Sequence, residues 1–564
     1  MAKAKGIVRR LRGEFSLGGE IAEADGLLND AFFDSSLYRA LRSKDDRRCF
    51  VVGRTGSGKS ATLLRLKEEN PAHVIEINPI DLSLPYITDL GVVQYLSALE
   101  VHLDSLYNAL WKHVLLIEIV KHRYSINSPD AKQRFLSSVI DKIRGDSKKK
   151  AALAYLEEFE GKFWCETDER VRDITHKIED QFKSEAAAKF GVKPADVNFS
   201  TGDVSISSRE ERVELAQRFQ RVVNETQLPK LNTMMQVLND EILDSPQNFT
   251  YIVIDDLDKN WASDRVKNDL IRNLFQVVFD LKRVQNLKVI VALRTNIFEA
   301  LDFSTSGGQG EKFRALTMRV RWTPGEIESL LDERARVAGT LHNLPDINSV
   351  RDILPGSNNT ARVKPLAHIL RRTLMRPRDA IAYVNECLSL AEGKERLTWE
   401  VLNRAEVRYS RGRLLALRDE WEPTYPGIEK MLHCFNEAPG TLSPEMLTKY
   451  LDDSAFLMAD VSFTGIKWLT ELTSPLWNSG DSDEWAELYQ PLVKLLYDIG
   501  FLGTFIANQK EAVFSQDDPD IADAIENLRR ATGFMIHPAF WAALSVSNAA
   551  ERRGRRSITS PRRG

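Results

Sequence analysis

The glycine-rich stretch GRTGSGKS at 53–60 constrains the fold of this chain more than any other feature. It follows the short apolar run Cys49–Val52 and precedes Ser60–Glu69, where leucines recur at helical spacing, so a strand, a loop and a helix are expected in that order. Glycines let successive backbone N–H groups face one anion, and the positive end of the next helix adds to the attraction. Lys59 would reach the β and γ phosphates, and Ser60 would offer a hydroxyl to Mg²⁺. The predicted nucleotide-binding residues are Gly53, Arg54, Thr55, Gly56, Ser57, Gly58, Lys59, Ser60 and Ala61.

Paired acids close a second apolar run, YIVI, about 200 residues further on. A triphosphate site needs a carboxylate for the metal and a second group to orient or deprotonate water. We expect Asp255 to hold Mg²⁺, largely through water, and Asp256 to act on the attacking water. The alternative is a capping pair for the next helix. Asp258 fits two roles equally, a cap or a group that holds the loop and Trp261 in place.

Polar residues also follow the next strand candidate, LKVIVAL. Arg294, Thr295 and Asn296 would lie at the carboxyl edge of a parallel sheet, where ligands bind, and one of them could sense the γ-phosphate or position water. A surface turn is the alternative. Lys312 and Arg314 precede the last strand candidate, and an arginine there could reach the nucleotide of a neighbouring subunit; a solvated loop fits equally well.

Strand and helix patterns alternate around these motifs, which predicts a parallel α/β sheet with right-handed crossovers. About 170 residues separate the second and third strands, far more than a crossover needs, so an inserted, mostly helical subdomain is expected, with a hairpin at VNFSTGDVSIS. The strand candidates are Cys49–Val52, His73–Ile77, Phe249–Trp261, Leu287–Asn296 and Thr317–Trp322.

Helical patterns dominate the chain after Trp322. The Thr-Pro start at 323 and 324 opens the first helix, and LSPEMLTKYL has the pattern of a capped one. A later helix should end at Gly500, and FLGTFI followed by EAVFS predicts a hairpin. Helices followed by a two-stranded wing favour a winged-helix module.

Composition limits the function classes. The 77 Lys and Arg against 81 Asp and Glu leave a formal charge of −4, so a chain that is basic throughout is excluded and nucleic-acid contact would have to be local. The tail AAERRGRRSITSPRRG is expected to be solvated, with a phosphate-backbone contact as the alternative. Four dispersed cysteines predict reduced thiols and a cytoplasmic location, with no membrane span and no signal peptide.

These motifs resemble the additional-strand (ASCE-type) P-loop ATPases of the AAA+/STAND group. GRTGSGKS, VIDDLDKNW, VIVALRTN and RPRDAI are most similar to bacterial ATPases with an IDDLD Walker B motif, including KAP-like and related anti-phage defence ATPases. The resemblance covers 20–540 and implies a nucleotide core, a helical lid and a winged-helix-like domain. It also implies ATP and Mg²⁺ as cofactors and an assembly of identical subunits.

The same resemblance assigns roles residue by residue. Lys59 and Ser60 match Walker A, and Asp255 and Asp256 match Walker B. The remaining matches are Arg294 and Thr295 in the sensor 1 region, Arg314 as an arginine finger, and Arg378 of RPRDAI as sensor 2. The second Walker B acid is Asp256 where the commonest pattern has Glu; its shorter arm suits a slow switch better than a fast motor. No effector signature accompanies these motifs, so a separate effector protein is implied.

The sequence therefore predicts a regulatory ATPase, with three functions weighed. The first is an oligomerising switch in anti-phage defence; the second is an ATP-dependent DNA-binding protein similar to initiators or loaders; the third is a small-molecule kinase. Acids between 394 and 533, as in DSDEWAELY, disfavour broad DNA contact. The expected divisions are an N-terminal segment at 1–45, the ATPase core at 46–95 and 246–325, the insertion at 96–245, the lid at 326–393, the winged-helix-like domain at 394–545 and the tail at 546–564.

Overall fold

A computed structural model describes most of the chain. Its described residues are 11–79, 103–124, 137, 180, 183, 184, 187, 228–259, 264–301, 310–357, 363–478, 484–506 and 509–547. They form two compact units. The sheet unit comprises Ser36–Arg54 and Lys59–Val320; the helical unit comprises Met1–Ser35, Thr55–Gly58 and Arg321–Gly564. Each unit is considered by itself below.

The sheet unit is built on five parallel strands in the order β2-β3-β4-β1-β5. Because β4 lies between β1 and β3, the strand before the glycine-rich loop and the strand before the paired acids are separated by an additional strand, as the ASCE-type prediction requires. This confirms the predicted parallel α/β P-loop core. The strands are β1 (Phe50–Val52), β2 (Val74–Ile77), β3 (Thr250–Ile254), β4 (Leu287–Leu293) and β5 (Thr317–Arg319).

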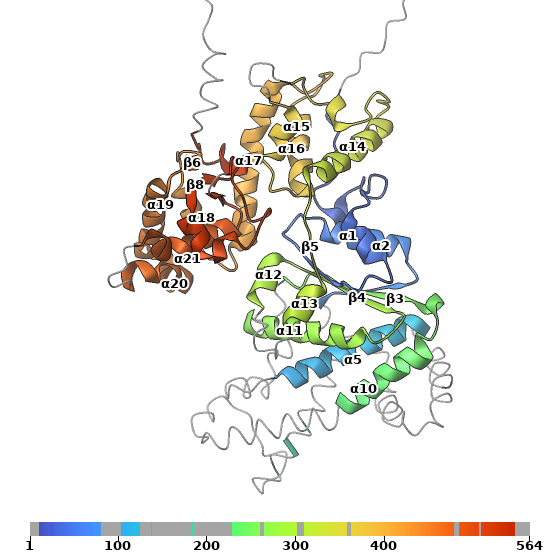
Figure 1. Ribbon diagram of the computed structural model, residues 1–564. Coiled ribbons are helices and arrows are strands. Elements are labelled where there is room, and N and C mark those ends of the chain that lie inside the picture. The colour runs from blue at the N-terminus through green and yellow to red at the C-terminus, as the bar shows by residue number, and fades with distance from the viewer. Residues whose placement is uncertain are drawn as a thin grey trace, which may run out of the picture. The chain divides into compact units, whose positions relative to one another are not determined.

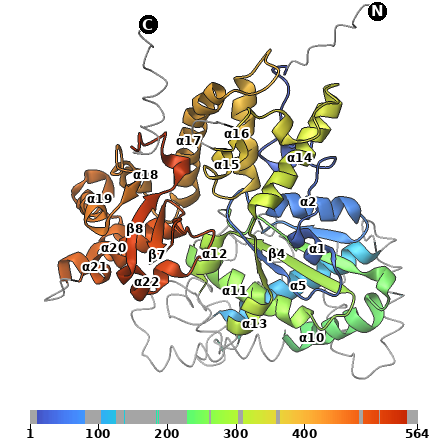
Figure 2. The ribbon, with the colours of Figure 1, turned by 45° about the horizontal axis from the view of Figure 1, so that its top comes forward.

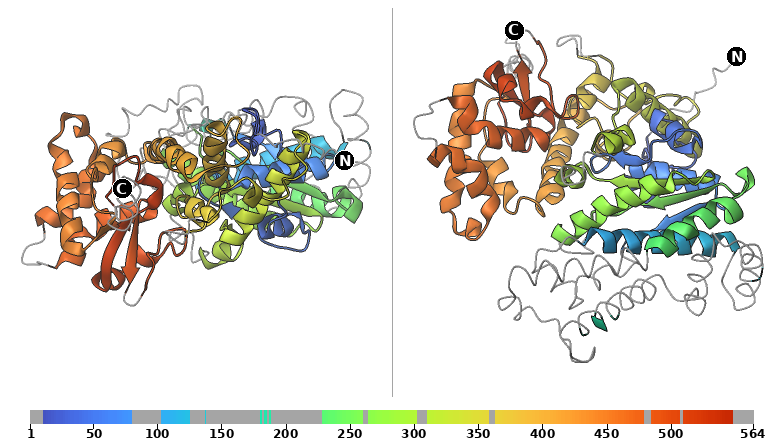
Figure 3. Two further views of the ribbon diagram at one scale, coloured as in Figure 1. Left: turned by 90° about the horizontal axis from the view of Figure 1, so that it is seen from above. Right: turned by 60° about the horizontal axis from the view of Figure 1, so that its bottom comes forward.

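Helices cover both faces of this sheet (Figures 1 and 3). The crossover from β1 to β2 and the crossover from β3 to β4 run in opposite directions along the sheet, so right-handed connections place their helices on opposite faces. One face carries α1 (Ser36–Arg42) and α2 (Lys59–Glu69); the other carries α5 (Asp104–Tyr124) and α11 (Asp264–Leu281), with α10 (Leu228–Val237) packed on α5. Two short helices, α12 (Thr295–Ala300) and α13 (Gly310–Ala315), follow β4.

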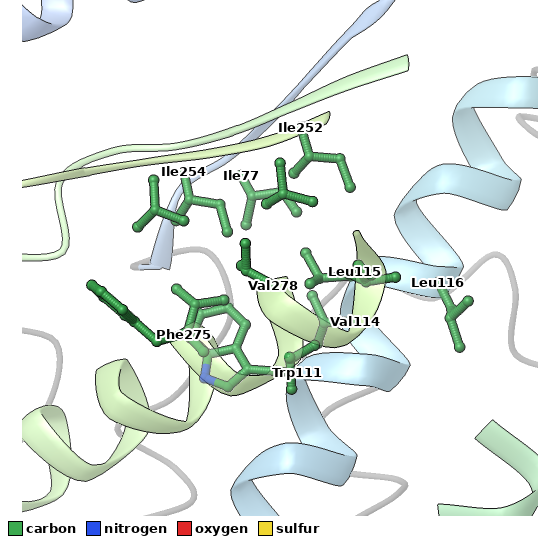
Figure 4. Packing of buried hydrophobic residues seen from close by; sticks show 14 of the residues in the cluster. Ile77, Trp111, Val114, Leu115, Leu116, Ile252, Ile254, Phe275 and Val278 are labelled. Atoms are coloured by element: carbon green, nitrogen blue, oxygen red, sulfur yellow. The ribbon is translucent and has the colours of Figure 1, made fainter. Parts of the chain in front are cut away.

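The two described ends of the expected insertion belong to the core of the sheet unit. Trp111 of α5 is fully buried and donates a 2.9 Å hydrogen bond to the Leu270 carbonyl of α11. Figure 4 shows Trp111 beside Phe275 of α11, below Ile254 of β3 in that view. We expected 96–245 to form a subdomain of its own, yet α5 packs on the sheet and α10 packs on α5, and their apolar side chains share one core with the strands. Most of its middle, including the hairpin expected at 197–207, lies outside the described residues, as does Trp261.

The helical unit begins with a bundle that the chain's N-terminal segment joins. Thr323 caps α14 in a reciprocal capping box with Glu326, as the Thr-Pro signal predicts. Leu11 exchanges 2.8 Å backbone hydrogen bonds with Gly393 and Lys394, so residues expected to form a separate segment pack with the lid. The bundle helices are α14 (Pro324–Leu341), α15 (Pro365–Leu370), α16 (Pro377–Ser389) and α17 (Trp399–Trp421).

The C-terminal part of the helical unit has a winged-helix-like order (Figure 2). The short strand β6, which lies between α18 and α19, pairs with the last strand, β8, and β8 also pairs with β7, the strand that follows α21; the antiparallel order is β6-β8-β7. Ser443 caps α19, and α21 ends before Gly500 with its φ of 76°, both as predicted. The elements are α18 (Ile428–His433), β6 (Thr441–Leu442), α19 (Pro444–Phe456), α20 (Lys467–Asn478), α21 (Trp485–Asp498), β7 (Leu502–Ile506), α22 (Ile525–Arg529) and β8 (Ala531–Ile536).

The predicted hairpin of β7 with EAVFS is present only as a single bridge. EAVFS contributes one bridge, in which Val513 and Thr504 exchange two 2.9 Å hydrogen bonds, whereas the continuous partner is β8. Phe514 turns its ring onto Gly503, and the Asp517 carboxylate accepts from the Phe514 N–H at 3.2 Å, so the chain leaves the sheet after one pair. Among the described helices, none combines the length and apolarity needed to cross a membrane.

Candidate nucleotide site

The glycine-rich loop connects β1 to α2, which begins at Lys59. Gly56 and Gly58 have φ of 78° and 92°, a left-handed backbone that side chains other than glycine rarely adopt. The Gly53 N–H donates to the Leu293 carbonyl at 3.1 Å, which ties the start of the loop to the end of β4. The predicted strand–loop–helix context is therefore present, with the first helical turn directed at the loop.

Lys59 folds back over the start of the loop. Its Nζ donates to the Gly53 carbonyl at 2.7 Å and to the Arg54 carbonyl at 3.1 Å. These carbonyls keep an ammonium at the loop, where phosphate oxygens would offer it stronger, charge-assisted partners. Ala61 follows in the first turn of α2, half-buried. The lysine is thus positioned at the loop as the motif predicts.

Ser60 and Asp255 lie together, as expected of a pair that shares one metal ion. The Ser60 hydroxyl donates to Asp255 Oδ2 at 3.0 Å. Mg²⁺ prefers hard oxygen donors and usually combines one or two protein groups with phosphate oxygens and water, which fits a hydroxyl beside a carboxylate. Within the described ranges, no cluster of three or more His, Cys, Asp or Glu side chains forms a metal cage. These two oxygens suit a nucleotide-bound Mg²⁺ rather than an ion held by the protein alone.

The two acids after β3 have different surroundings. Burial raises the pKa of Asp255, while the Asp256 N–H, at 2.9 Å from Asp255 Oδ1, acts to lower it. Asp256 is half-exposed, has a left-handed φ of 61° and forms a 2.8 Å ion pair with Lys259. Neither acid caps a helix, because the residues that follow them, 257–259, form a turn and a bend and not a first helical turn. The capping alternative is therefore wrong.

Arg294 is held by Asp258, a relationship that the sequence patterns did not predict. Asp258 Oδ2 lies 2.6 Å from Arg294 Nη2, and the two residues follow adjacent parallel strands, β3 and β4. Thr295 and Asn296 form the first turn of α12 and are half-buried. Adjacent strand ends could have suggested this pairing, since parallel strands bring their carboxyl ends to one edge.

The candidate finger residues lie on α13. Lys312 Nζ is 5.7 Å from the centroid of the Phe279 ring, and Phe313 between the two basic residues is buried. Arg314 is exposed on this helix. Its position is compatible with contact to a second subunit, which stays a prediction.

The tip of the loop, Thr55–Gly58, belongs to the helical unit, and side chains and backbone of that unit hydrogen-bond to it. Arg376 Nη1 donates to the Thr55 carbonyl at 2.9 Å, and Trp322 Nε1 donates to the Ser57 carbonyl at 2.9 Å. Arg378 donates its backbone N–H to the Gly56 carbonyl at 3.4 Å, and a Cβ on Gly56 would come within 2.8 Å of the Arg378 Cβ. The glycine at 56 is therefore required both by its φ and by this close approach.

Buried charged side chains hold Arg376 in position beside the loop tip. Asp379, at 0% exposure, accepts from Arg376 Nε at 3.0 Å and from Arg413 Nη1 at 2.8 Å. Burial alone would raise the pKa of Asp379, but the two guanidinium groups outweigh it and lower the pKa to about 2. Glu420, near the end of α17, accepts the Thr55 N–H at 3.2 Å and lies 3.3 Å from Arg376 Nη1.

A cavity of about 530 Å³ within the helical unit opens beside Thr55 and these charges. Arg378 extends along it and donates through Nε to the Glu20 carbonyl at 2.9 Å; burial lowers the pKa of this guanidinium from its usual value. The RPRDAI motif contains both Arg378, which was predicted, and Arg376, to which no role was assigned. Three other lining residues were missed, because no motif joins positions so far apart in the chain: Glu20, Arg413 and Glu420.

Comparisons with known proteins match this architecture in part. Residues 325–418, which span α14 to most of α17, match the FunZ-associated C-terminal helical domain. The chain is 23% identical to the "Putative transposon gamma-delta 80.3 kDa protein" of Escherichia coli K12, over 94% of this chain and 67% of that protein. A solved structure of the Aeropyrum pernix Orc1 protein in complex with DNA aligns over 90% of this chain and 89% of its own, at 13% identity and a TM-score of 0.29, which is too low to support an argument.

Proposed function

We propose that this protein is a Mg²⁺-dependent regulatory ATPase that binds and hydrolyses ATP. The observation that carries the proposal is the 3.0 Å hydrogen bond from the Ser60 hydroxyl to Asp255, directly after a lysine that lies on the loop carbonyls. A hydroxyl, a carboxylate and an ammonium at a helix N-terminus are the set that a Mg²⁺–triphosphate requires.

Hydrolysis would use the second acid of the pair. Water attacks the γ-phosphorus, the bond from that phosphorus to the β–γ bridging oxygen breaks, and the proton of the water passes to the Asp256 carboxylate and then to solvent. Bound Mg²⁺ would neutralise charge on the phosphates. Asp256 forms an ion pair with Lys259, whose pKa this carboxylate raises, so the pair must loosen before Asp256 can accept a proton. Arg294, with Asp258 behind it, is the candidate group for the γ-phosphate.

Regulation would act through the lid and through assembly. Arg378 lies at the loop tip and would sense the γ-phosphate, while Arg314 would act on the nucleotide of a neighbouring subunit. The setting we propose, a switch in bacterial anti-phage defence with a separate effector protein, rests on the motif resemblance given above. The transposon protein of E. coli points to mobile genetic elements as a related setting.

An ATP-dependent DNA-binding protein is the second candidate, and the winged-helix-like strand order favours it. The charge of the module opposes it. On α21, the helix that precedes the wing, Glu487 is exposed and most apolar side chains are buried. Glu487 and the adjacent Glu484 are paired with Arg529, so this face would repel phosphates rather than attract them.

The test is phosphate release from ATP and Mg²⁺ without any added acceptor. We expect release by the wild-type protein, and a loss of at least about 100-fold in Asp256→Asn with nucleotide affinity retained. Asp244→Asn, an acid remote from the loop in the same unit, serves as the control and should keep the wild-type rate. ATP binding without release in the wild type would contradict hydrolysis, and release only after adding a small-molecule acceptor would favour the kinase alternative.

A further inference from the structure

One backbone N–H of the glycine-rich loop already donates to a carboxylate of the protein itself. Glu420 Oε1 accepts the Thr55 N–H at 3.2 Å, and the Glu420 side chain is only 7% exposed. Backbone N–H groups of such a loop normally face anionic phosphate oxygens. Arg376 lies 3.3 Å from the second carboxylate oxygen and also donates to the Thr55 carbonyl, so an internal ion pair is fixed to the loop tip.

The helix that carries Glu420 has its two halves in different hydrophobic cores. Its first half contributes Leu402 and Tyr409 to the core of the bundle, and its second half contributes Leu417 and Trp421 to the core of the winged-helix-like module. At 1.5 Å per residue α17 is about 34 Å long, and a helix packed on both sides transmits a displacement rather than absorbing it. Glu420 is therefore placed where a change at the loop tip reaches the C-terminal module.

We propose that Glu420 is an internal competitor for the loop, displaced from the Thr55 N–H by the terminal phosphate of a bound nucleoside triphosphate. This inference rests on the proposed function. A negative side chain beside the loop disfavours each added negative charge, so it penalises ATP more than ADP. Glu420 is in this sense a specificity-determining residue, and its displacement moves the end of α17.

A structural role for the same contact predicts the opposite result. If Glu420 only supports the shape of the loop, loss of its charge should weaken the binding of both nucleotides. Glu420→Gln separates the two, because glutamine has the same size and its amide oxygen can still accept from the Thr55 N–H. The substitution removes the charge and leaves Arg376 and Arg378 in place.

The experiment measures the affinity of the full-length protein for ATP and for ADP, with Mg²⁺, by calorimetry in an Asp256→Asn background that slows turnover. Glu420→Gln should tighten ATP binding about tenfold and ADP binding less. Glu429→Gln is the matched control. Glu429, on α18, pairs at the surface with Arg418 of α17, the helix that carries Glu420, and its substitution should change neither affinity. Unchanged or weaker ATP binding in Glu420→Gln would overturn the inference.

Hydrogen exchange of the wild-type protein gives a second readout if the variant folds poorly. Added ATP should increase exchange over 413–425, while ADP should do so less. Equal protection with either nucleotide would also overturn the inference. Failure of the wild-type protein to bind any nucleotide would instead refute the proposed function, so the two failures are distinguishable.

Discussion

Asp258 and Arg294 form an ion pair across the ends of β3 and β4, with 2.6 Å between Asp258 Oδ2 and Arg294 Nη2. This pair fixes the direction of the guanidinium at the carboxyl edge of the sheet. We expect Asp258→Asn to lower kcat for ATP roughly 10-fold with little change in KM, because Arg294 would lose its orientation and not its charge. Asp269→Asn, which removes a comparable ion pair to Arg272 on α11, should leave kcat unchanged. An equal loss in both variants would indicate a general structural effect.

Lys59→Ala should abolish most nucleotide binding. The ammonium lies on the loop carbonyls of Gly53 and Arg54, from which it can transfer to phosphate oxygens. We expect affinity for ATP to fall by at least about 30-fold, measured by calorimetry, since a charge-assisted contact to phosphate is lost. Lys67→Ala, on the same helix but paired with Glu76 at the surface, is the control. Wild-type affinity in Lys59→Ala would be incompatible with the proposed loop chemistry.

Asp379 should make the helical unit sensitive to acid. Its folded pKa of about 2 lies below the unfolded value, so its ionised form stabilises the fold above about pH 4 and this contribution is lost as the pH falls toward 2. The contribution is on the order of 2 kcal/mol. Asp379→Asn should lower the unfolding free energy at pH 7 by about 3–5 kcal/mol, because two buried guanidinium groups lose their shared partner. Urea unfolding at several pH values checks both effects, and the exposed Asp419→Asn should change neither.

Gly503→Ala should destabilise the winged-helix-like module. A Cβ at this position would come within 2.6 Å of the Phe514 ring, so the ring or the strand would have to shift. We expect a loss of about 1–3 kcal/mol in thermal unfolding. Gly412→Ala makes a useful contrast, since nothing lies within 4 Å of its Cβ and the helix should gain stability. Equal stability in both variants would mean that the Phe514 contact is loose in solution.

Arg314 is expected to act on a neighbouring subunit's nucleotide. If so, Arg314→Ala and Asp256→Asn should each be nearly inactive alone, while a mixture should recover activity, because some sites then combine an intact Asp256 with an intact Arg314. The measurements are phosphate release and native mass with ATP. Lys312→Ala, two residues away in the same short helix, should remain active. A mixture that stays inactive would argue against a residue supplied in trans.

The core of the fold could be predicted because its signals are local. Each signal depends on neighbouring residues: the glycines at 56 and 58, the apolar run before Asp255, and the alternation of strands with helices. The structure has the left-handed φ at both glycines and the expected parallel sheet. The capped helix after Ser443 and the helix end before Gly500 follow from equally local rules.

Contacts between distant residues escaped prediction. The pairing of β7 with EAVFS stops after one bridge, where Phe514 packs on Gly503, and the longer ladder of β7 forms with β8; no strand propensity encodes either result. Likewise, Glu420 meets Thr55 from 365 positions away, and a lone buried glutamate near the end of a helix carries no motif. Asp258 could have been paired with Arg294 only by combining the sheet order with the positions of both strand ends.

The left-handed backbone at Asp256 restricts which amino acids can stand there. Aspartate and asparagine adopt a φ near 61° more readily than glutamate, because their short polar side chains bond locally to the backbone. A change of Asp256 to glutamate, which looks conservative on paper, would therefore add conformational strain together with the longer reach. The conformation of the turn and the identity of the acid should therefore change together in evolution: relatives with glutamate at this position should also have a different turn after β3.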